Sequence, residues 1–179
     1  MRNRSLTKWQ PRLPILPLAG TFQITEGALV ATERLLPTYR GPDGDHEGIV
    51  FLCGRELGKT TVLTTVIAPD CDHGPGHVMC SMAEVQAVTA HAHDVGLGVL
   101  AQVHSHPSAW SEHSVGDDTM VLMPFEGMLS IVVPHYGHHG MRPLHSLGVH
   151  QYRSGQWVRV EPHTIKAGVT VLPGFLDLR

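Results

Sequence analysis

The feature that most constrains the fold is a predicted strand that ends in two histidines one residue apart. The run 99–103, Val-Leu-Ala-Gln-Val, is typical of a strand, and His104-Ser105-His106-Pro107 follows it directly. Because side chains of a strand alternate between the two faces of its sheet, His104 and His106 point to the same face. Pro107 ends the strand and turns the chain outward. The sequence therefore predicts two imidazoles side by side at the mouth of a strand.

A hydroxyl and a carboxylate follow this pair, three positions apart. Ser114 can cap a helix whose first turn contains Asp117, and a carboxylate is favoured at that positive end. Capping explains both residues without a metal, but it leaves the two imidazoles unexplained. Together, His104, His106 and Asp117 are three ligands of the kind that a catalytic zinc takes, with the fourth position left to water. Asp118 is an alternative ligand, although spacing and position at the helix start favour Asp117.

A water activated by a metal needs a base to take its proton. Glu47 is the natural candidate because it stands at the head of the apolar run 49–54, which predicts a central strand of the same sheet. The competing interpretation of Glu47 is a solvated loop carboxylate. The other glutamates that we considered fall within predicted helices or a turn, and they are Glu26, Glu33, Glu56 and Glu84.

Length and patterning predict one domain with a substantial core, since the chain has 179 residues, of which 42% are hydrophobic and 16% charged. We expect a proline-punctuated arm over 1–20, a domain over 21–165 and a tail over 166–179. The expected elements are strands at 21–24, 49–54, 60–67, 99–103, 129–133, 147–152 and 156–160, helices after Thr25 and after the Ser81/Glu84 capping box, and a short helix at 117–123. This order predicts an α/β fold with a mixed central sheet flanked by helices.

Net charge and cysteine content limit the cellular compartment and the classes of partner that the sequence predicts. The net charge of −3 gives no general reason to bind nucleic acid or an anionic membrane. No apolar run approaches the length of a membrane span, and prolines interrupt the basic N-terminus, which makes it a poor signal peptide. Three cysteines form no CxxC pair, and we expect Cys53 to be a buried free thiol. These features favour a soluble protein in the reducing cytoplasm.

The segment from His104 to Asp117 resembles the motif of the JAMM metalloproteases, the catalytic branch of the MPN domains. It matches their pattern of HxH, seven residues and SxxD, and Glu47 followed by the apolar run 49–54 resembles their glutamate-then-strand segment. The resemblance covers roughly residues 22 to 160. It implies a single MPN/JAMM domain, which is cytidine-deaminase-like, with one zinc ion bound by His104, His106 and Asp117. Glu47 would be the general acid/base, and Ser114 would support the tetrahedral intermediate.

The same resemblance implies a function and a substrate. Family members hydrolyse the isopeptide or peptide bond after the C-terminus of ubiquitin or a ubiquitin-like protein, for precursor processing or deconjugation. The expected partner is thus a ubiquitin-like C-terminal tail, with ubiquitin-activating- or ubiquitin-conjugating-like proteins as further partners. The tail would lie as an added strand along a sheet edge, near the 69–80 loop and Trp110. The main alternative is a catalytically inert MPN scaffold that binds partners, while a nucleobase deaminase lacks its HxE and PCxxC signature here.

Overall fold

The computed structural model describes residues 13–119 and 124–174. The strands are β1 Ile15–Leu16, β2 Thr21–Thr25, β3 Arg40–Gly41, β4 Gly44–Asp45, β5 Ile49–Leu57, β6 Thr60–Ile67, β7 Asp72–Gly74, β8 His77–Met79, β9 Gly98–Ser105, β10 Leu129–Val133, β11 Gly148–Arg153, β12 Gln156–Val160 and β13 Val169–Leu172. The α-helices are α1 Glu26–Leu35, α2 Met82–Asp94, α3 Val115–Thr119 and α4 Pro162–Gly168, and short 3-10 turns occupy Leu36–Thr38, His135–Gly137 and Leu144–Ser146.

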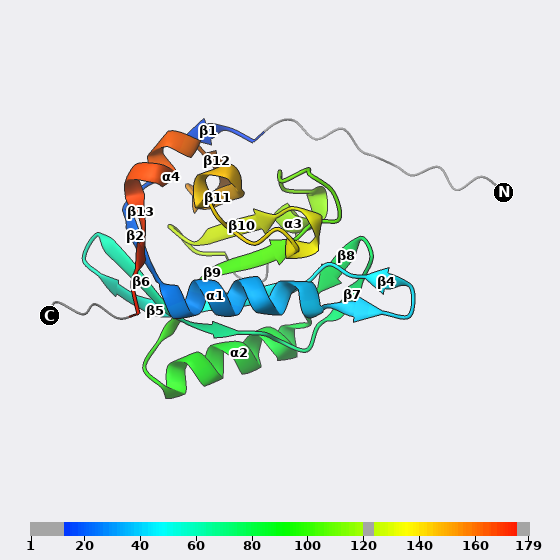
Figure 1. The fold of residues 1–179 in the computed structure, drawn as a ribbon. Helices are drawn as coiled ribbons and strands as arrows, with labels where there is room; N and C mark the ends of the chain where they lie inside the picture. Colours follow the sequence, from blue (N-terminus) through cyan, green and yellow to red (C-terminus); the bar gives the residue numbers. More distant parts are fainter. Residues whose placement is uncertain (1–12, 120–123, 175–179) are drawn as a thin grey trace, which may run out of the picture.

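A nine-stranded mixed sheet organises the molecule, in the order β1-β12-β11-β10-β9-β5-β6-β2-β13. The central pair β5 and β9 is antiparallel, whereas β9 and β10 are parallel. In Figure 1 β2 and β13 run nearly vertically while β9 and β10 run across the view, so the sheet curls around α1. The α/β fold with a mixed sheet flanked by helices is therefore confirmed.

Helix α1 packs on the inner face of this curl, where the main core lies. The Thr25 side chain caps the helix by accepting a hydrogen bond from the Ala28 N–H, as its sequence position predicts. Leu29 joins Val50 and Val103 in one buried cluster of apolar side chains. Side chains that alternate with these along β5 and β9 must point to the opposite face, and His104 is one of them.

Helix α2 covers part of that opposite face. It opens with the capping box that the sequence predicts, in which Ser81 and Glu84 exchange hydrogen bonds with each other's backbone N–H. Val85 of this helix lines a cavity together with Ile49 and Phe51, whose side chains alternate with the core side chains of β5. The two helices thus pack on opposite faces of the central strands (Figure 1).

The chain after the histidines folds back over the sheet and crosses β11 at close range. A Cβ built on Gly148 would lie 1.7 Å from the Ser111 carbonyl oxygen, so only glycine lets the two backbones approach this closely.

We expect Gly148→Ala to lower the free energy of unfolding by about 3 kcal/mol, because the backbone of the segment that crosses β11 must move. Urea unfolding measures this, with Gly98→Ala as the matched strand control, since a Cβ there meets only the Leu100 side chain at 3.5 Å. Equal stability of the two variants would contradict the close crossing.

The 69–80 segment, which the sequence leaves as a loop, contains a hairpin of β7 and β8. Cys71 and Cys80 close this hairpin with a disulfide, while Cys53 is free and buried as expected. The disulfide argues against the expected reducing setting, because such bonds persist in oxidising compartments.

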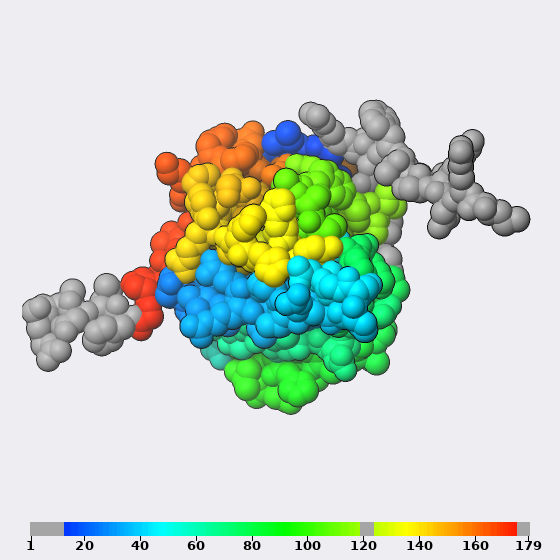
Figure 2. Space-filling model, turned by 45° about the vertical axis from the view of Figure 1, so that its right-hand side comes forward, coloured from blue at the N-terminus to red at the C-terminus, as the bar shows by residue number. Residues whose placement is uncertain are grey.

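The turn at 135–137 contacts the β7–β8 hairpin. His135 and Tyr136 both adopt left-handed backbone angles, which are unfavourable for residues with a Cβ. The Tyr136 N–H donates to the His106 carbonyl at 2.8 Å, and its hydroxyl donates to the Pro75 carbonyl at 2.8 Å. Figure 2 shows this part of the chain (yellow) against the neighbouring β3–β4 hairpin (cyan). The turn therefore links the second histidine to the β7–β8 hairpin.

Parts of both expected terminal segments lie in the sheet. β1, within the arm over 1–20, pairs with β12, and β13, within the tail over 166–179, pairs in parallel with β2. Residues 1–12 and 175–179 lie outside the described chain, as does the 120–123 end of the expected short helix. No helix among residues 13–119 and 124–174 is long and apolar enough to cross a membrane.

Candidate metal centre

Two histidines and one aspartate converge at the C-terminal end of β9. His104 Nε2 lies 3.3 Å from Asp117 Oδ1, and His106 Nε2 lies 3.3 Å from Asp117 Oδ2. One ligand atom from each of the three residues falls within 4.8 Å of the others. Both histidines are buried, with 2% and 3% of their surface exposed. The structure therefore brings together the three ligands that the sequence predicts.

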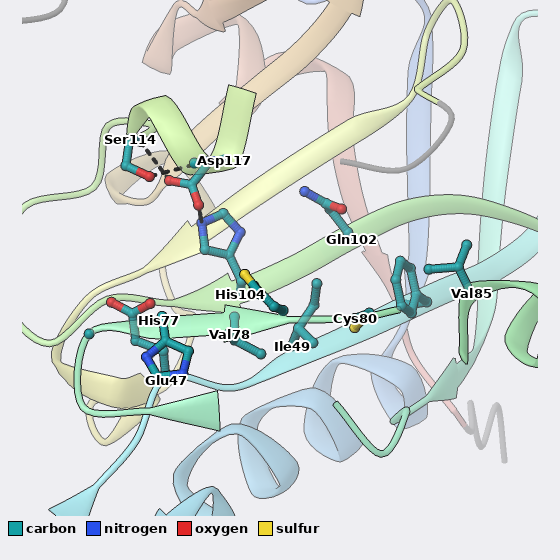
Figure 3. A pocket seen from close by; sticks show the side chains of 14 residues that line it. Glu47, Ile49, His77, Val78, Cys80, Val85, Gln102, His104, Ser114 and Asp117 are labelled. Atoms are coloured by element: carbon teal, nitrogen blue, oxygen red, sulfur yellow. Dashed lines mark hydrogen bonds and ion pairs between the residues drawn. The ribbon is translucent and has the colours of Figure 1, made fainter. Parts of the chain in front are cut away.

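The aspartate is held by the local structure of α3. The Asp117 N–H donates to Ser114 Oγ at 3.1 Å, and the Ser114 N–H donates to Asp117 Oδ2 at 2.6 Å. This reciprocal cap leaves Oδ1 facing His104, as Figure 3 shows. Asp118, the alternative ligand, turns away and bonds to His113 Nδ1 at 2.9 Å. Capping and ligation are thus compatible functions of the same Ser-x-x-Asp sequence.

The hydrogen bonds around the imidazoles fit a metal ion. His104 Nε2 is buried, and in the described chain its one polar contact is the Asp117 carboxylate at 3.3 Å, without good hydrogen-bond geometry. A buried nitrogen that is so poorly satisfied is costly unless it binds something. His106 Nδ1 donates to the Trp110 carbonyl at 3.1 Å, which turns Nε2 toward Asp117 as the nitrogen that would face a cation. Such a bond to the distal nitrogen is how proteins orient a ligand histidine. Two nitrogens and a carboxylate oxygen suit a divalent cation of the zinc type.

Opposite charges stabilise the ionised carboxylate at this centre. Burial alone would raise the pKa of Asp117, but the attraction of His104 and hydrogen bonds from His106 and the Ser114 backbone hold it far below the usual range. Burial likewise opposes protonation of His106, yet the bond and charge of Asp117 raise its pKa. The centre is therefore organised around a permanent negative charge, which is what a cation requires.

Glu47 lies beside this centre rather than in solvent, so the solvated-loop interpretation is wrong. Its surface is 9% exposed, and its N–H donates to the Gly74 carbonyl of the β7–β8 hairpin at 2.9 Å. Burial, opposed by His106 and assisted by Asp117, raises the pKa of Glu47 to about 7. A carboxyl with this pKa exchanges its proton readily at neutral pH.

A cavity of about 180 Å³ joins these side chains, and Figure 3 shows its lining. Glu47, His104, Ser114 and Asp117 form its polar end. Its other end is apolar and is lined from β5, α2 and the hairpin by Ile49, Phe51, Val78, Met79 and Val85. The four glutamates that compete with Glu47 do not line it. The arrangement can therefore bind a cation and place a base and a hydroxyl group next to a substrate that is partly apolar.

Three further side chains at the site have roles that the sequence leaves open. Trp110 is 49% exposed and also stacks on His106, with ring centroids 5.1 Å apart. His46, directly before Glu47 in the sequence, is buried in the β3–β4 region and bonded to His73 at 2.8 Å. Burial lowers the pKa of His113, directly before Ser114, to about 4, so this imidazole is neutral. Their burial depends on long-range packing, and only the positions of His46 and His113 next to the motif could have singled them out.

The chain resembles several known proteins in sequence or in fold. No protein-family model matches the chain. The protein named "Probable metalloprotease y4jG" of Sinorhizobium fredii (strain NBRC 101917 / NGR234) is 26% identical over 130 residues, which cover 70% of this chain and 80% of that protein. A JAB1/MPN domain protein of Archaeoglobus fulgidus, AF2198, is 21% identical, with a TM-score of 0.46 over 83% of this chain and 98% of its own.

Two further solved structures superpose over most of the chain. Protein DSY2949 of Desulfitobacterium hafniense has a TM-score of 0.61 and 14% identity, covering 86% of this chain and 94% of its own. A protein of Salinibacter ruber (strain DSM 13855) has a TM-score of 0.56 and 15% identity, covering 88% and 95%. The chain therefore shares its mixed α/β fold with these solved proteins and is related in sequence to a protein named as a metalloprotease.

Proposed function

We propose that this chain is a zinc-dependent peptidase that hydrolyses the amide bond after the C-terminal tail of a ubiquitin-like protein. The observation that carries the proposal is the convergence of His104, His106 and Asp117 on one point, with the buried Glu47 in the same cavity as His104 and Asp117. The likeness to a protein named as a probable metalloprotease supports it. The motif's resemblance to the JAMM metalloproteases supports the choice of zinc and of an isopeptidase or peptidase reaction.

Each side chain has one task in this reaction. His104, His106 and Asp117 hold the ion, which when bound supplies Lewis acidity for a water molecule and for the scissile carbonyl. Glu47 takes a proton at its carboxylate and later returns it to the departing amine. The Ser114 oxygen accepts a hydrogen bond from the Asp117 N–H, which leaves the hydroxyl proton available. Ser114 donates this proton in a hydrogen bond to the developing oxyanion.

The apolar end of the cavity supports an extended peptide as the substrate. β8 lines the cavity with residues 77–79 and, in the described chain, pairs only with β7, so its other edge is open to an added strand. Main-chain hydrogen bonds to this edge would hold a flexible tail, and Val78, Met79 and Phe51 would receive its apolar side chains. Ubiquitin-activating- or ubiquitin-conjugating-like proteins are the further partners that this substrate implies.

The test uses the purified full chain with ubiquitin-like proteins that carry a C-terminal extension, either as linear fusions or as isopeptide conjugates. We expect release of the extension after the tail, its loss with a chelator, and recovery on adding zinc. Mass spectrometry of the products identifies the bond that is cut. Zinc binding and tail binding without any cleavage would replace the proposal with the inert MPN scaffold.

Ser114→Ala is expected to lower kcat by about 10²–10³, the usual effect of removing one oxyanion donor. The same change removes the cap of α3 and costs about 1 kcal/mol of stability. Ser114→Thr keeps the hydroxyl and serves as the matched control. Steady-state kinetics at saturating zinc separate the two effects, and an unchanged kcat in Ser114→Ala would show that the hydroxyl does not act on the substrate.

A further inference from the structure

A row of buried polar side chains crosses four strands beneath the segment that carries Ser114 and Asp117. Gln102 of β9 is paired with Ser130 of β10, Ser130 with His150 of β11, and His150 with Arg159 of β12. Directly paired residues project to the same face, so this polar row lies on the face of His104. All but Arg159 are at most 4% exposed. Burying a polar row of this kind is costly wherever a member lacks a hydrogen bond.

The segment 111–118 lies on this row through consecutive residues. The Ser111 backbone crosses Gly148, as described above. Glu112 pairs with Arg159 at 3.4 Å and reaches His150 at 3.6 Å. His113 stacks on the His150 ring with centroids 3.8 Å apart. The metal-binding turn is thus placed on the sheet by the residues immediately before it.

His113 makes two hydrogen bonds whose direction can be assigned. A carboxylate only accepts, so His113 Nδ1 carries the proton that it donates to Asp118 at 2.9 Å. Nε2 then accepts from the Ser130 hydroxyl at 2.9 Å. Ser130 Oγ in turn accepts from the Gln102 amide at 3.0 Å. The bonds form one directed chain from Gln102, which lines the cavity, to Asp118, the neighbour of the ligand Asp117.

We propose that His113 is a positioning residue for the metal ligand Asp117, which it fixes through its hydrogen bonds to Asp118 and Ser130. The reason is that α3 is too short to hold Asp117 in place by itself. Helix α3 spans only five residues, Val115–Thr119, and so short a helix needs tertiary contacts to keep its geometry. The bond to Asp118 ties its first turn to the sheet that bears His104, so that Asp117 keeps its distance from both imidazoles. This inference rests on the metal site of the proposed function.

The experiment measures zinc affinity by chelator competition, with the thermal unfolding midpoint of the metal-free protein as a second readout. His113→Phe keeps the ring and its stack but removes both hydrogen bonds, and we expect it to weaken zinc binding by about 10–100-fold, the effect typical of lost outer-sphere support. His150→Phe is the matched control, because His150 is equally buried in the same stack and, among the described residues, its ring nitrogens have only the long 3.6 Å contact with Glu112, which Arg159 also holds. We expect wild-type affinity from this control, whatever its melting temperature.

His113→Asn provides a rescue, because its side-chain amide can still donate to Asp118. We expect its zinc affinity to lie between those of His113→Phe and the wild type. Wild-type affinity in His113→Phe, or equal loss in His113→Phe and His150→Phe, would overturn the positioning function while leaving the proposed peptidase intact. Failure of the wild-type protein itself to bind zinc would instead overturn the proposed function, and the inference with it.

Discussion

Glu47→Gln is expected to bind zinc as the wild type does and to lose cleavage activity by about 10⁴-fold, at the upper end of general acid–base effects. Glutamine has the same size but cannot take a proton from water or return one to an amine. The ligands His104, His106 and Asp117 are untouched by the change, so the metal content should stay at one ion per chain. Product release from a ubiquitin-like fusion and metal analysis of the same sample measure the two quantities.

The pH profile of the wild type provides the companion measurement. Burial raises the pKa of Glu47 to about 7, and the base acts only when ionised, so kcat/KM should fall as the pH drops through the pKa of Glu47. A bound cation favours the carboxylate and shifts this acid limb below 7. Glu56→Gln, in the exposed end of the same strand β5, is the control and should leave the profile unchanged. Normal turnover by Glu47→Gln would exclude this residue as the base.

His106→Ala is expected to abolish both metal binding and activity. The change removes one of three ligands and leaves the Asp117 carboxylate with a single imidazole, so an ion would be lost to a chelator at low concentration. We expect no zinc after dialysis and cleavage at the level of the protein-free reaction. Metal analysis and the fusion-cleavage assay test this. His91→Ala is the control, because His91 lies exposed on α2 and, within residues 13–119 and 124–174, bonds only to the Ala87 carbonyl of its own helix. A zinc-loaded, active His106→Ala protein would exclude His106 as a ligand.

Much of the fold could be predicted because its signals are local. Thr25 and the Ser81/Glu84 pair mark helix starts through hydrogen bonds within one turn, and the structure has both caps. The run 99–103 and the alternation of His104 with His106 depend only on the period of a strand. The same holds for Ser114 and Asp117, whose mutual hydrogen bonds span three residues. The ligand set is therefore encoded in short-range spacing.

Features that depend on register between distant strands could not be predicted. The pairing of β13 with β2 brings residues 169–172 beside residues 22–25, and no local pattern signals such a contact. The polar row of Gln102, Ser130 and His150 exists only because three strands align in one register. The pairing of Cys71 with Cys80 likewise depends on the hairpin that brings them together. The burial of Glu47 follows from the same hairpin, whose Gly74 carbonyl accepts from its N–H.

The convergence of the proposed metal ligands has a thermodynamic consequence for the whole chain. His104 stands at the end of a strand paired on both sides, opposite Ile49 and Val132, whereas Asp117 arrives from a separate helix. The binding geometry therefore exists only in the native state, and an ion that binds there shifts the folding equilibrium by mass action. At a free concentration one hundred times the dissociation constant, this linkage adds about 2.7 kcal/mol to the free energy of unfolding. The melting temperature of the protein should consequently rise with the zinc concentration around it. Under the proposed function, metal supply would then set the stability of the folded chain as well as its activity.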